Sequence, residues 1–220
     1  MKLSPMNFWD FHTHQKGKAN AIFNGDDEVS PAGLFCSLGI HPWDLDENWE
    51  VKWLKISSQV KESPSVLAIG ECGFDRLKGP ELEIQKAAFH AQASLAFELG
   101  IPLILHCVKG HDLLLEYLKK EKNIPQIIWH GWNLKPDLAL RLLDFPVFFS
   151  FGHHLKKEES NAQAWLKACP PHRIFFETDD SNMEISEIYQ AASLILGLSP
   201  AELAQQGISN WNQISSRKIQ

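Results

Sequence analysis

The sequence lacks an excess of positive charge. Its 220 residues carry 21 Lys and Arg against 27 Asp and Glu, which gives a net charge of −6. Proteins that hold DNA mainly by neutralising phosphates usually have a basic balance or a basic stripe. The deficit argues against broad electrostatic binding of a duplex. Any nucleic-acid substrate has to be held locally, by metal ions above all.

Long apolar segments and paired cysteines are also missing. No apolar run approaches the length of about 18 residues that a membrane span needs, and the chain does not begin like a signal peptide. The four cysteines form no CxxC pair, which is typical of buried thiols in a reducing compartment. We therefore expect a cytoplasmic protein with no membrane partner. The oligomeric state stays open, with a monomer favoured.

What the sequence does contain is enough apolar material for one sizeable core. Hydrophobic residues make up 44% of the chain and charged residues 22%, a composition that excludes a disordered chain. We expect a single domain over residues 1–220. Eight short apolar runs with little alternation are typical of parallel strands buried on both faces. They are Phe8 to Phe11, Ala21 to Phe23, Leu34 to Ile40, Val66 to Ile69, Leu103 to Leu105, Ile127 to Trp129, Val147 to Phe151 and Ile174 to Phe176.

Helical patterns separate the later runs and indicate βαβ units. Eight strands fit a TIM (β/α)₈ barrel. The alternative is an open doubly wound sheet, which is not favoured because no GxGxxG motif follows the first run. Only nine residues link Phe11 to Ala21, and about ten link Phe23 to Leu34, which is too short for a helical crossover. The sequence predicts a distorted barrel whose first two helices are short or missing, with little or no helix between residues 15 and 33. The predicted helices are Trp49 to Lys61, Pro80 to Leu99, Asp112 to Lys122, Pro136 to Leu143, Glu158 to Ala168, Glu184 to Leu196 and a last one from Pro200.

Polar residues follow the apolar runs where each run ends. Seven runs end in His, Glu or Asp, and the carboxyl ends of barrel strands meet on the face where active sites are built. His12 and His14 are two apart on a strand, so both imidazoles can reach one ion. Imidazole and carboxylate without thiolate suit Zn, Mn, Fe, Co or Mg. The candidate ligands are His12, His14, Glu71, His106, His130 and Asp179.

Simpler explanations exist for each of these residues. A histidine after an apolar run is often a hydrogen-bonded core residue, and Asp179 could cap a following helix. Burying Glu71 without a partner is costly, which favours a metal beside it. His41, in Gly39-Ile40-His41-Pro42, could orient the site or contact substrate.

Six motifs follow one another along the chain: Asp10-Phe11-His12-Thr13-His14, Gly39-Ile40-His41-Pro42, Gly70-Glu71-Cys72-Gly73-Phe74-Asp75, Pro102-Leu103-Ile104-Leu105-His106-Cys107, His130 and Glu177-Thr178-Asp179. In this order they resemble the motifs of the TatD family, metal-dependent hydrolases of the amidohydrolase-like superfamily that are often described as deoxyribonucleases. The resemblance covers nearly the whole chain. Val108, Trp132 and the short Asp180-Ser181-Asn182 loop depart from the family pattern.

This resemblance implies two divalent ions, Mg, Mn or Zn. It implies that His12 and His14 bind one ion, that His106 and His130 bind the other, and that Glu71 bridges them. Asp179 would be a ligand and also the acid/base, so that Glu71 and Asp179 are the catalytic pair. Asp75 would lie near the phosphate of the substrate.

Hydrolysis of DNA phosphodiesters by a metal-activated water is the leading functional hypothesis, with single strands or ends preferred. Lys109 and Arg76 could contact phosphate, and Trp43 or Trp132 could stack on a base. The first alternative is hydrolysis of a small ester, lactone, amide or phosphate at the same site. The second is a metal-binding protein without catalytic activity.

Overall fold

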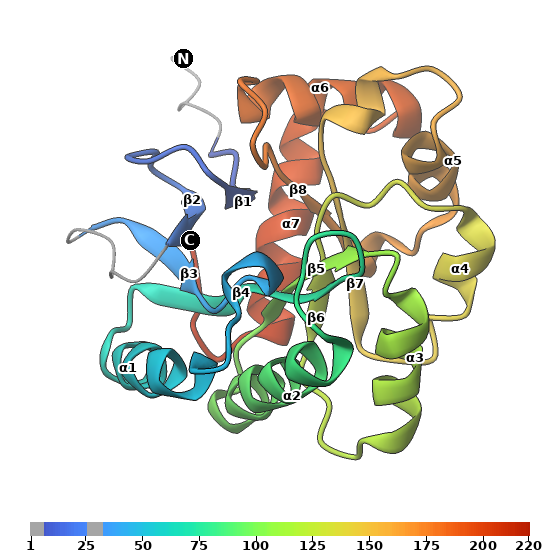
Figure 1. The fold of residues 1–220 in the computed structure, drawn as a ribbon. Helices are drawn as coiled ribbons and strands as arrows, with labels where there is room; N and C mark the ends of the chain where they lie inside the picture. The colour runs from blue at the N-terminus through green and yellow to red at the C-terminus, as the bar shows by residue number, and fades with distance from the viewer. Residues whose placement is uncertain (1–6, 26–32) are drawn as a thin grey trace.

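Eight parallel strands form one sheet whose spatial order follows the chain, β1 to β8, in the computed structural model (Figure 1), which describes residues 7–25 and 33–220. An isolated parallel bridge joins Thr13 of β1 to Asp179, three residues after the end of β8, and so brings the two edges of the sheet together. The prediction of a (β/α)₈ barrel is confirmed. The strands are Asp10–Thr13, Ala21–Gly25, Phe35–Leu38, Val66–Asp75, Leu103–Val108, Ile127–Trp129, Val147–Phe151 and Ile174–Phe176.

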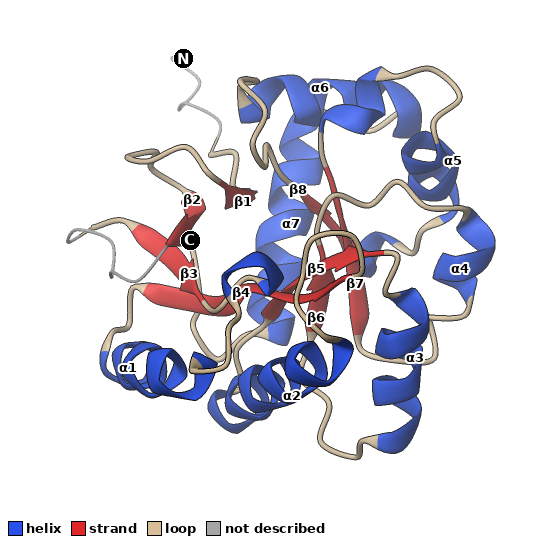
Figure 2. Cartoon of the chain, in the orientation of Figure 1, coloured by secondary structure: helices blue, strands red, loops and turns tan. Residues whose placement is uncertain are grey.

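Seven α-helices and three short 3₁₀ helices are found in the described chain (Figure 2). Their ends follow local chemistry: Gly100 ends α2 in the left-handed conformation, and Ser199 begins α7 with a capping box. Within residues 7–25 and 33–220, no helix is both long and apolar enough to cross a membrane. Helices α1 to α7 are Trp49–Glu62, Leu82–Leu99, His111–Lys120, Pro136–Leu140, Asn161–Ala168, Ile185–Leu196 and Pro200–Ile214, and η1 to η3 are Pro42–Asp44, His153–Lys156 and Pro171–Arg173.

The first two strands differ from the rest. The connection from β1 to β2 and the described part of the connection from β2 to β3 contain no helix, as the short spacing predicts. Residues 26–32 of that prediction lie outside the described residues. In Figure 1, α1 lies below β3 and the other helices lie on the side of β4 to β8. The part of the barrel formed by β1 and β2 receives no helix from the described parts of its own connections.

Two clusters of buried apolar residues hold the barrel together. The larger one packs the helices against the outside of the sheet. The smaller one includes Ile104 and Ile128, which precede His106 and His130 by two positions. Because side chains alternate along a strand, each isoleucine lies on the same face of the sheet as its histidine. The barrel therefore has an apolar floor beneath a layer of polar residues at the carboxyl ends of the strands.

Candidate metal centre

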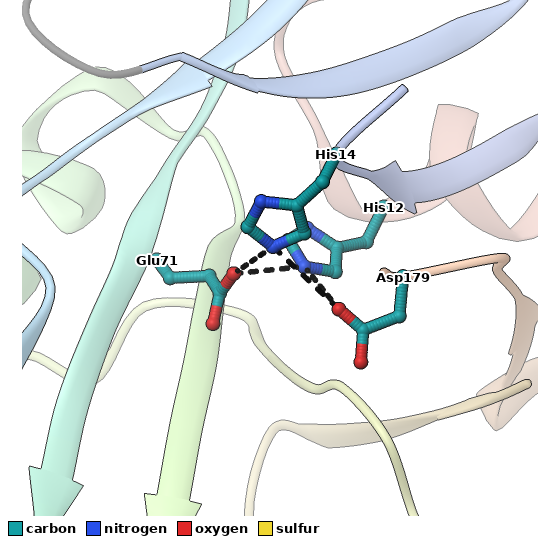
Figure 3. Close-up of side chains that lie close together, drawn as sticks. All are labelled: His12, His14, Glu71 and Asp179. Atoms are coloured by element: carbon teal, nitrogen blue, oxygen red, sulfur yellow. Dashed lines mark hydrogen bonds and ion pairs between the residues drawn. The ribbon is translucent and has the colours of Figure 1, made fainter. Parts of the chain in front are cut away.

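The Glu71 carboxylate lies between two groups of side chains, one at each oxygen. Oε1 is 3.0 Å from Nε2 of His12 and 2.9 Å from Nε2 of His14. Oδ1 of Asp179 is 3.5 and 3.6 Å from the same two nitrogens. Figure 3 shows these four side chains converging from different strands and loops.

The second oxygen of Glu71 faces a different set of imidazoles. Oε2 is 3.0 Å from Nε2 of His130 and 3.3 Å from Nδ1 of His106, and these two nitrogens are 3.4 Å apart. Nε2 of His41 lies 3.6 Å from Oε2. The structure thus brings the six sequence-predicted ligands together, three on the Oε1 side and two on the Oε2 side of a shared carboxylate. His41 joins the Oε2 side.

An irregular stretch of β4 presents Glu71. The apolar pattern placed the end of this strand at Ile69, whereas β4 continues to Asp75 with a shift in its pairing to β5. Gly73 has φ +147°, and an added Cβ would lie 2.0 Å from the carbonyl oxygen of His106. Glycine is therefore required for β4 and β5 to approach each other here. The Glu71 N–H donates to Oδ1 of Asn24 at 2.9 Å.

Closure of the barrel brings Asp179 to the site. The backbone N–H of Asp179 donates to the carbonyl oxygen of His12, and the N–H of His14 donates to that of Asp179, each at 3.0 Å. Beside them, Asp10 accepts the N–H and the hydroxyl of Thr178 at 3.0 and 2.6 Å. The Thr13 hydroxyl lies 2.8 Å from that of Thr178. The first and last motifs of the chain are therefore held together by buried hydrogen bonds.

Two glutamines of α2 position the backbone beside His41 and at the end of β4. Oε1 of Gln92 accepts the backbone N–H of Ile40 at 2.7 Å, next to His41. Oε1 of Gln85 accepts the N–H of Asp75 at 2.8 Å, and its amide donates to the carbonyl oxygen of Asp75 at 3.1 Å. Both glutamines are buried, so α2 holds the site in place without touching a candidate ligand.

The electrostatics of the cluster favour charged carboxylates beside imidazoles. Burial opposes charge on Glu71, but attraction to His130 and His12 holds the pKa of Glu71 well below its usual range. Burial likewise disfavours protonated His12, yet attraction to Glu71 leaves the pKa of His12 well above its usual value. Burial lowers the pKa of His41 to about 4. Although burial opposes it, the adjacent His12 and His130 imidazoles lower the pKa of Asp179 to about 2.

These residues fit a divalent metal ion. His12, His14, Glu71 and Asp179 each offer a ligand atom within 4.8 Å of the others. His12 Nε2 is close to Glu71, yet neither nitrogen of this buried ring makes an aligned hydrogen bond to the described chain. Buried polar atoms are normally satisfied, and ligation would satisfy this one. A set of imidazoles and carboxylates is the donor chemistry of zinc, manganese and related ions.

The residues predicted to contact substrate do not all line the metal centre. Asp75 is buried and its carboxylate accepts from Trp43, from two backbone N–H groups and from Nε2 of His106 at 3.4 Å. It therefore orients a candidate ligand instead of facing substrate. The guanidinium of Arg76 pairs with Asp112 at 2.7 Å, and Lys109 is exposed.

Trp132 requires a correction. Its side chain is fully buried, and it packs edge-on against Trp129 and Phe149 with ring centroids 5.0 and 4.7 Å away. A ring with no exposed face cannot stack on a substrate. A position two residues after His130 does not by itself distinguish a core tryptophan from a substrate contact.

Comparison with known proteins gives a consistent assignment. A model of the TatD-related DNase family matches residues 25–214. The chain belongs to the TatD family.

Two relatives described as "3′-5′ ssDNA/RNA exonuclease TatD" cover about two thirds of the chain. The protein from Klebsiella pneumoniae is 32% identical over 152 residues, which are 67% of this chain and 57% of the relative. The protein from Enterobacter lignolyticus is 35% identical over 159 residues, which are 67% of this chain and 58% of the relative. This TatD-family chain thus spans less than two thirds of the length of either relative.

A solved TatD-family structure shares the fold over nearly the full length. The TatD homolog YJJV from Escherichia coli K12 superimposes with a TM-score of 0.78 at 19% identity, covering 96% of this chain and 98% of that one. A TatD-family hydrolase from Entamoeba histolytica gives a TM-score of 0.68 at 16% identity, covering 86% and 77%. At these identities the likeness shows the barrel fold.

Glu177 also lies in the cluster, beside His130 and Asp179, although the pattern of strand ends assigns it no role. It is fully buried, and Oε1 accepts the N–H of Gly131. Nδ1 of His130 lies 3.9 Å from the same oxygen, and burial raises the pKa of Glu177 to about 7. Its place in the Glu177-Thr178-Asp179 motif was the available signal. Glu177, His153 and His154 also line a pocket of about 340 Å³ beside His106 and His130.

Proposed function

We propose that this TatD-family chain is a metal-dependent hydrolase that cleaves phosphodiester bonds of single-stranded DNA or RNA from an end. The observation that carries the proposal is the shared carboxylate of Glu71, whose two oxygens face two separate sets of imidazoles. Such an arrangement suits two ions on opposite sides of a phosphoryl group. The names of the exonuclease relatives support nucleic acid as the substrate.

The residues on each side of Glu71 would hold one divalent ion, Mg, Mn or Zn. His12, His14 and Asp179 would hold the first, and His106 and His130 the second. Ions held by these residues would supply an activated water and offset charge on the phosphoryl oxygens.

Asp179 is the residue best placed to accept the proton of the attacking water. Its carboxylate is partly open, with 22% of the side chain exposed, and it lies beside the imidazoles of His12 and His14. The lowered pKa of Asp179 keeps its carboxylate ionised at neutral pH, which is the form that can bind an ion and accept a hydrogen bond from water. Glu71 holds the two sides at a fixed separation, and neutral His41 can donate a hydrogen bond to substrate.

The pocket beside the Oε2 side of Glu71 favours binding of a strand end over binding of the middle of a duplex. At about 340 Å³ it is at the lower limit of small-molecule sites. It can take one terminal nucleotide unit, and the negative net charge offers little hold on a duplex. The same size keeps hydrolysis of a small ester, lactone, amide or phosphate as the second candidate.

The test is an assay on end-labelled single-stranded DNA with Mg²⁺ or Mn²⁺ added. The wild type should release nucleotides, while Glu71→Ala and Asp179→Asn should be nearly inactive. Asp144→Asn is the matched control, because this aspartate is exposed and precedes β7 at the opposite end of the barrel.

Equal DNA profiles for the wild type and Asp179→Asn after long incubation would remove the nuclease proposal. Small phosphate esters, carboxylic esters and lactones would then be assayed with the same variants. Absence of turnover on all of them, with stoichiometric metal bound, would favour a metal-binding protein without catalytic activity.

A further inference from the structure

Trp43 is an exposed aromatic residue at the edge of the metal centre. It lies in η1, directly after the Gly39-Ile40-His41-Pro42 motif, and 49% of its surface is exposed. Its ring centroid is 4.7 Å from that of His41 and 5.8 Å from that of His106. It therefore adjoins the Oε2 side of Glu71, where a substrate phosphate would be held.

The exposed ring is nevertheless held in place. Nε1 of Trp43 donates to Oδ2 of Asp75 at 2.6 Å, and the same oxygen lies 3.4 Å from Nε2 of His106. One carboxylate thus fixes a candidate metal ligand and an exposed indole at a set separation. A fixed aromatic group loses little entropy when a ligand stacks on it.

A cation already occupies one face of this ring. Nζ of Lys78 lies 3.9 Å from the ring centroid of Trp43, while the backbone N–H of Lys78 is bound to Oδ1 of Asp75 at 3.0 Å. The lysine side chain is long and exposed, so a flat group can displace its ammonium at small cost. The displaced ammonium then remains within reach of a phosphate next to that group.

We propose that Trp43 is the platform on which a base adjacent to the scissile phosphate stacks, with Lys78 moving from the ring to the backbone phosphate. The inference rests on the proposed function for the class of ligand, a nucleic acid. It adds the residue that selects unpaired bases: a base in a duplex has both faces covered, whereas a single strand offers a free face at little cost. Trp43 then compensates in part for the missing positive charge.

The test separates base from backbone. Binding of two fluorescent oligomers of equal length is measured by anisotropy: an oligothymidylate and an oligomer that carries abasic sugars. The Asp179→Asn background keeps both intact, and Trp43→Ala and Trp43→Phe are introduced into it. Phe97→Ala is the matched control, because Phe97 has a similar exposure of 45% and lies at the end of α2 that leads into the start of β5, away from the mouth.

We expect Trp43→Ala to weaken oligothymidylate binding roughly 5- to 100-fold and to leave the abasic oligomer nearly unchanged. Trp43→Phe should keep most of the affinity, because it keeps an aromatic face, and Phe97→Ala should have no effect. In the wild-type background the same Trp43→Ala change should raise KM for oligothymidylate more than it lowers kcat.

Equal losses for the two oligomers, or no loss for either, would overturn the assignment of Trp43. Base-dependent binding without cleavage by the wild type would support the platform and overturn the nuclease activity. Cleavage that does not depend on Trp43 would support the nuclease activity and overturn the platform. Absence of both binding and cleavage would overturn both proposals.

Discussion

The two sides of Glu71 are built in different ways. On the Oε1 side, His12 and His14 belong to the first motif of the chain, whereas Asp179 belongs to the last, and they meet through the contacts between β1 and β8. On the Oε2 side, His106 and His130 come from β5 and the end of β6, which are neighbours in the sheet. One side depends on closure of the barrel, and the other depends only on adjacent strands.

The two sides also differ in exposure. The side chain of His14 is 43% exposed and that of Asp179 22%, whereas those of His106 and His130 are each 11% exposed. The Oε1 side is therefore open at His14 and Asp179, although His12 is only 1% exposed, and the Oε2 side is enclosed. The pocket of about 340 Å³ is lined by His106 and His130 and also reaches Asp179. Under the proposed function, we expect the open side to admit water and the enclosed side to hold the substrate.

Removing the Glu71 carboxylate should abolish metal binding on both of its sides. We expect Glu71→Ala to lose both ions and to lower kcat/KM on oligothymidylate by about 10³-fold or more. Metal analysis of the purified protein, next to the activity assay, checks this. Retention of two equivalents of metal would show that Glu71 does not bridge.

Single-ligand changes should separate the two sides. His14→Ala should lose the ion of the open side and keep the enclosed one, while His106→Ala should do the opposite, each with a drop in activity of about 10²-fold. In the unmodified protein, titration with a chelator should remove the ion of the open side first. The comparison fails if either variant loses both ions together.

The irregular part of β4 should be sensitive to one added methyl group. Gly73→Ala places a Cβ against the carbonyl oxygen of His106 and forces a left-handed backbone on alanine, so we expect about 3 kcal/mol of destabilisation. Gly197→Ala, which ends α6 with φ +70° and no atom within 4 Å of the added Cβ, should cost only about 1 kcal/mol. Urea denaturation measures both, and similar losses for the two would argue against a steric conflict at Gly73.

Weakening the contact between the first and last motifs should have the smallest effect on stability and metal binding. Thr178→Val removes a hydroxyl donor from the buried carboxylate of Asp10, and we expect about 1–2 kcal/mol of lost stability. The conservative variant Thr178→Ser should stay close to the wild type. Because only the open side depends on this closure, metal affinity should fall there first, which calorimetric titration of each variant with Zn²⁺ can show.

Several features followed from local chemistry and were visible without a structure. Apolar runs of strand length predicted the eight strands. Short connections after Phe11 and Phe23 predicted that the described parts of these connections contain no helix. The motifs that end these runs predicted the residues that meet at Glu71. Strand ends were harder, because β4 continues through Glu71 with a shifted register that an apolar pattern does not show.

Periodicity and residue type thus determined the barrel and the set of polar residues at its mouth, because both depend on neighbours along the chain. Tertiary structure alone decided which oxygen of Glu71 each imidazole faces, since this depends on how β1 meets β8 and how β4 meets β5. It also decided the fate of the two tryptophans that follow site histidines. Trp132 is packed among aromatic rings and buried, whereas Trp43 is held at the surface by Asp75, and only contacts between distant segments separate these two outcomes.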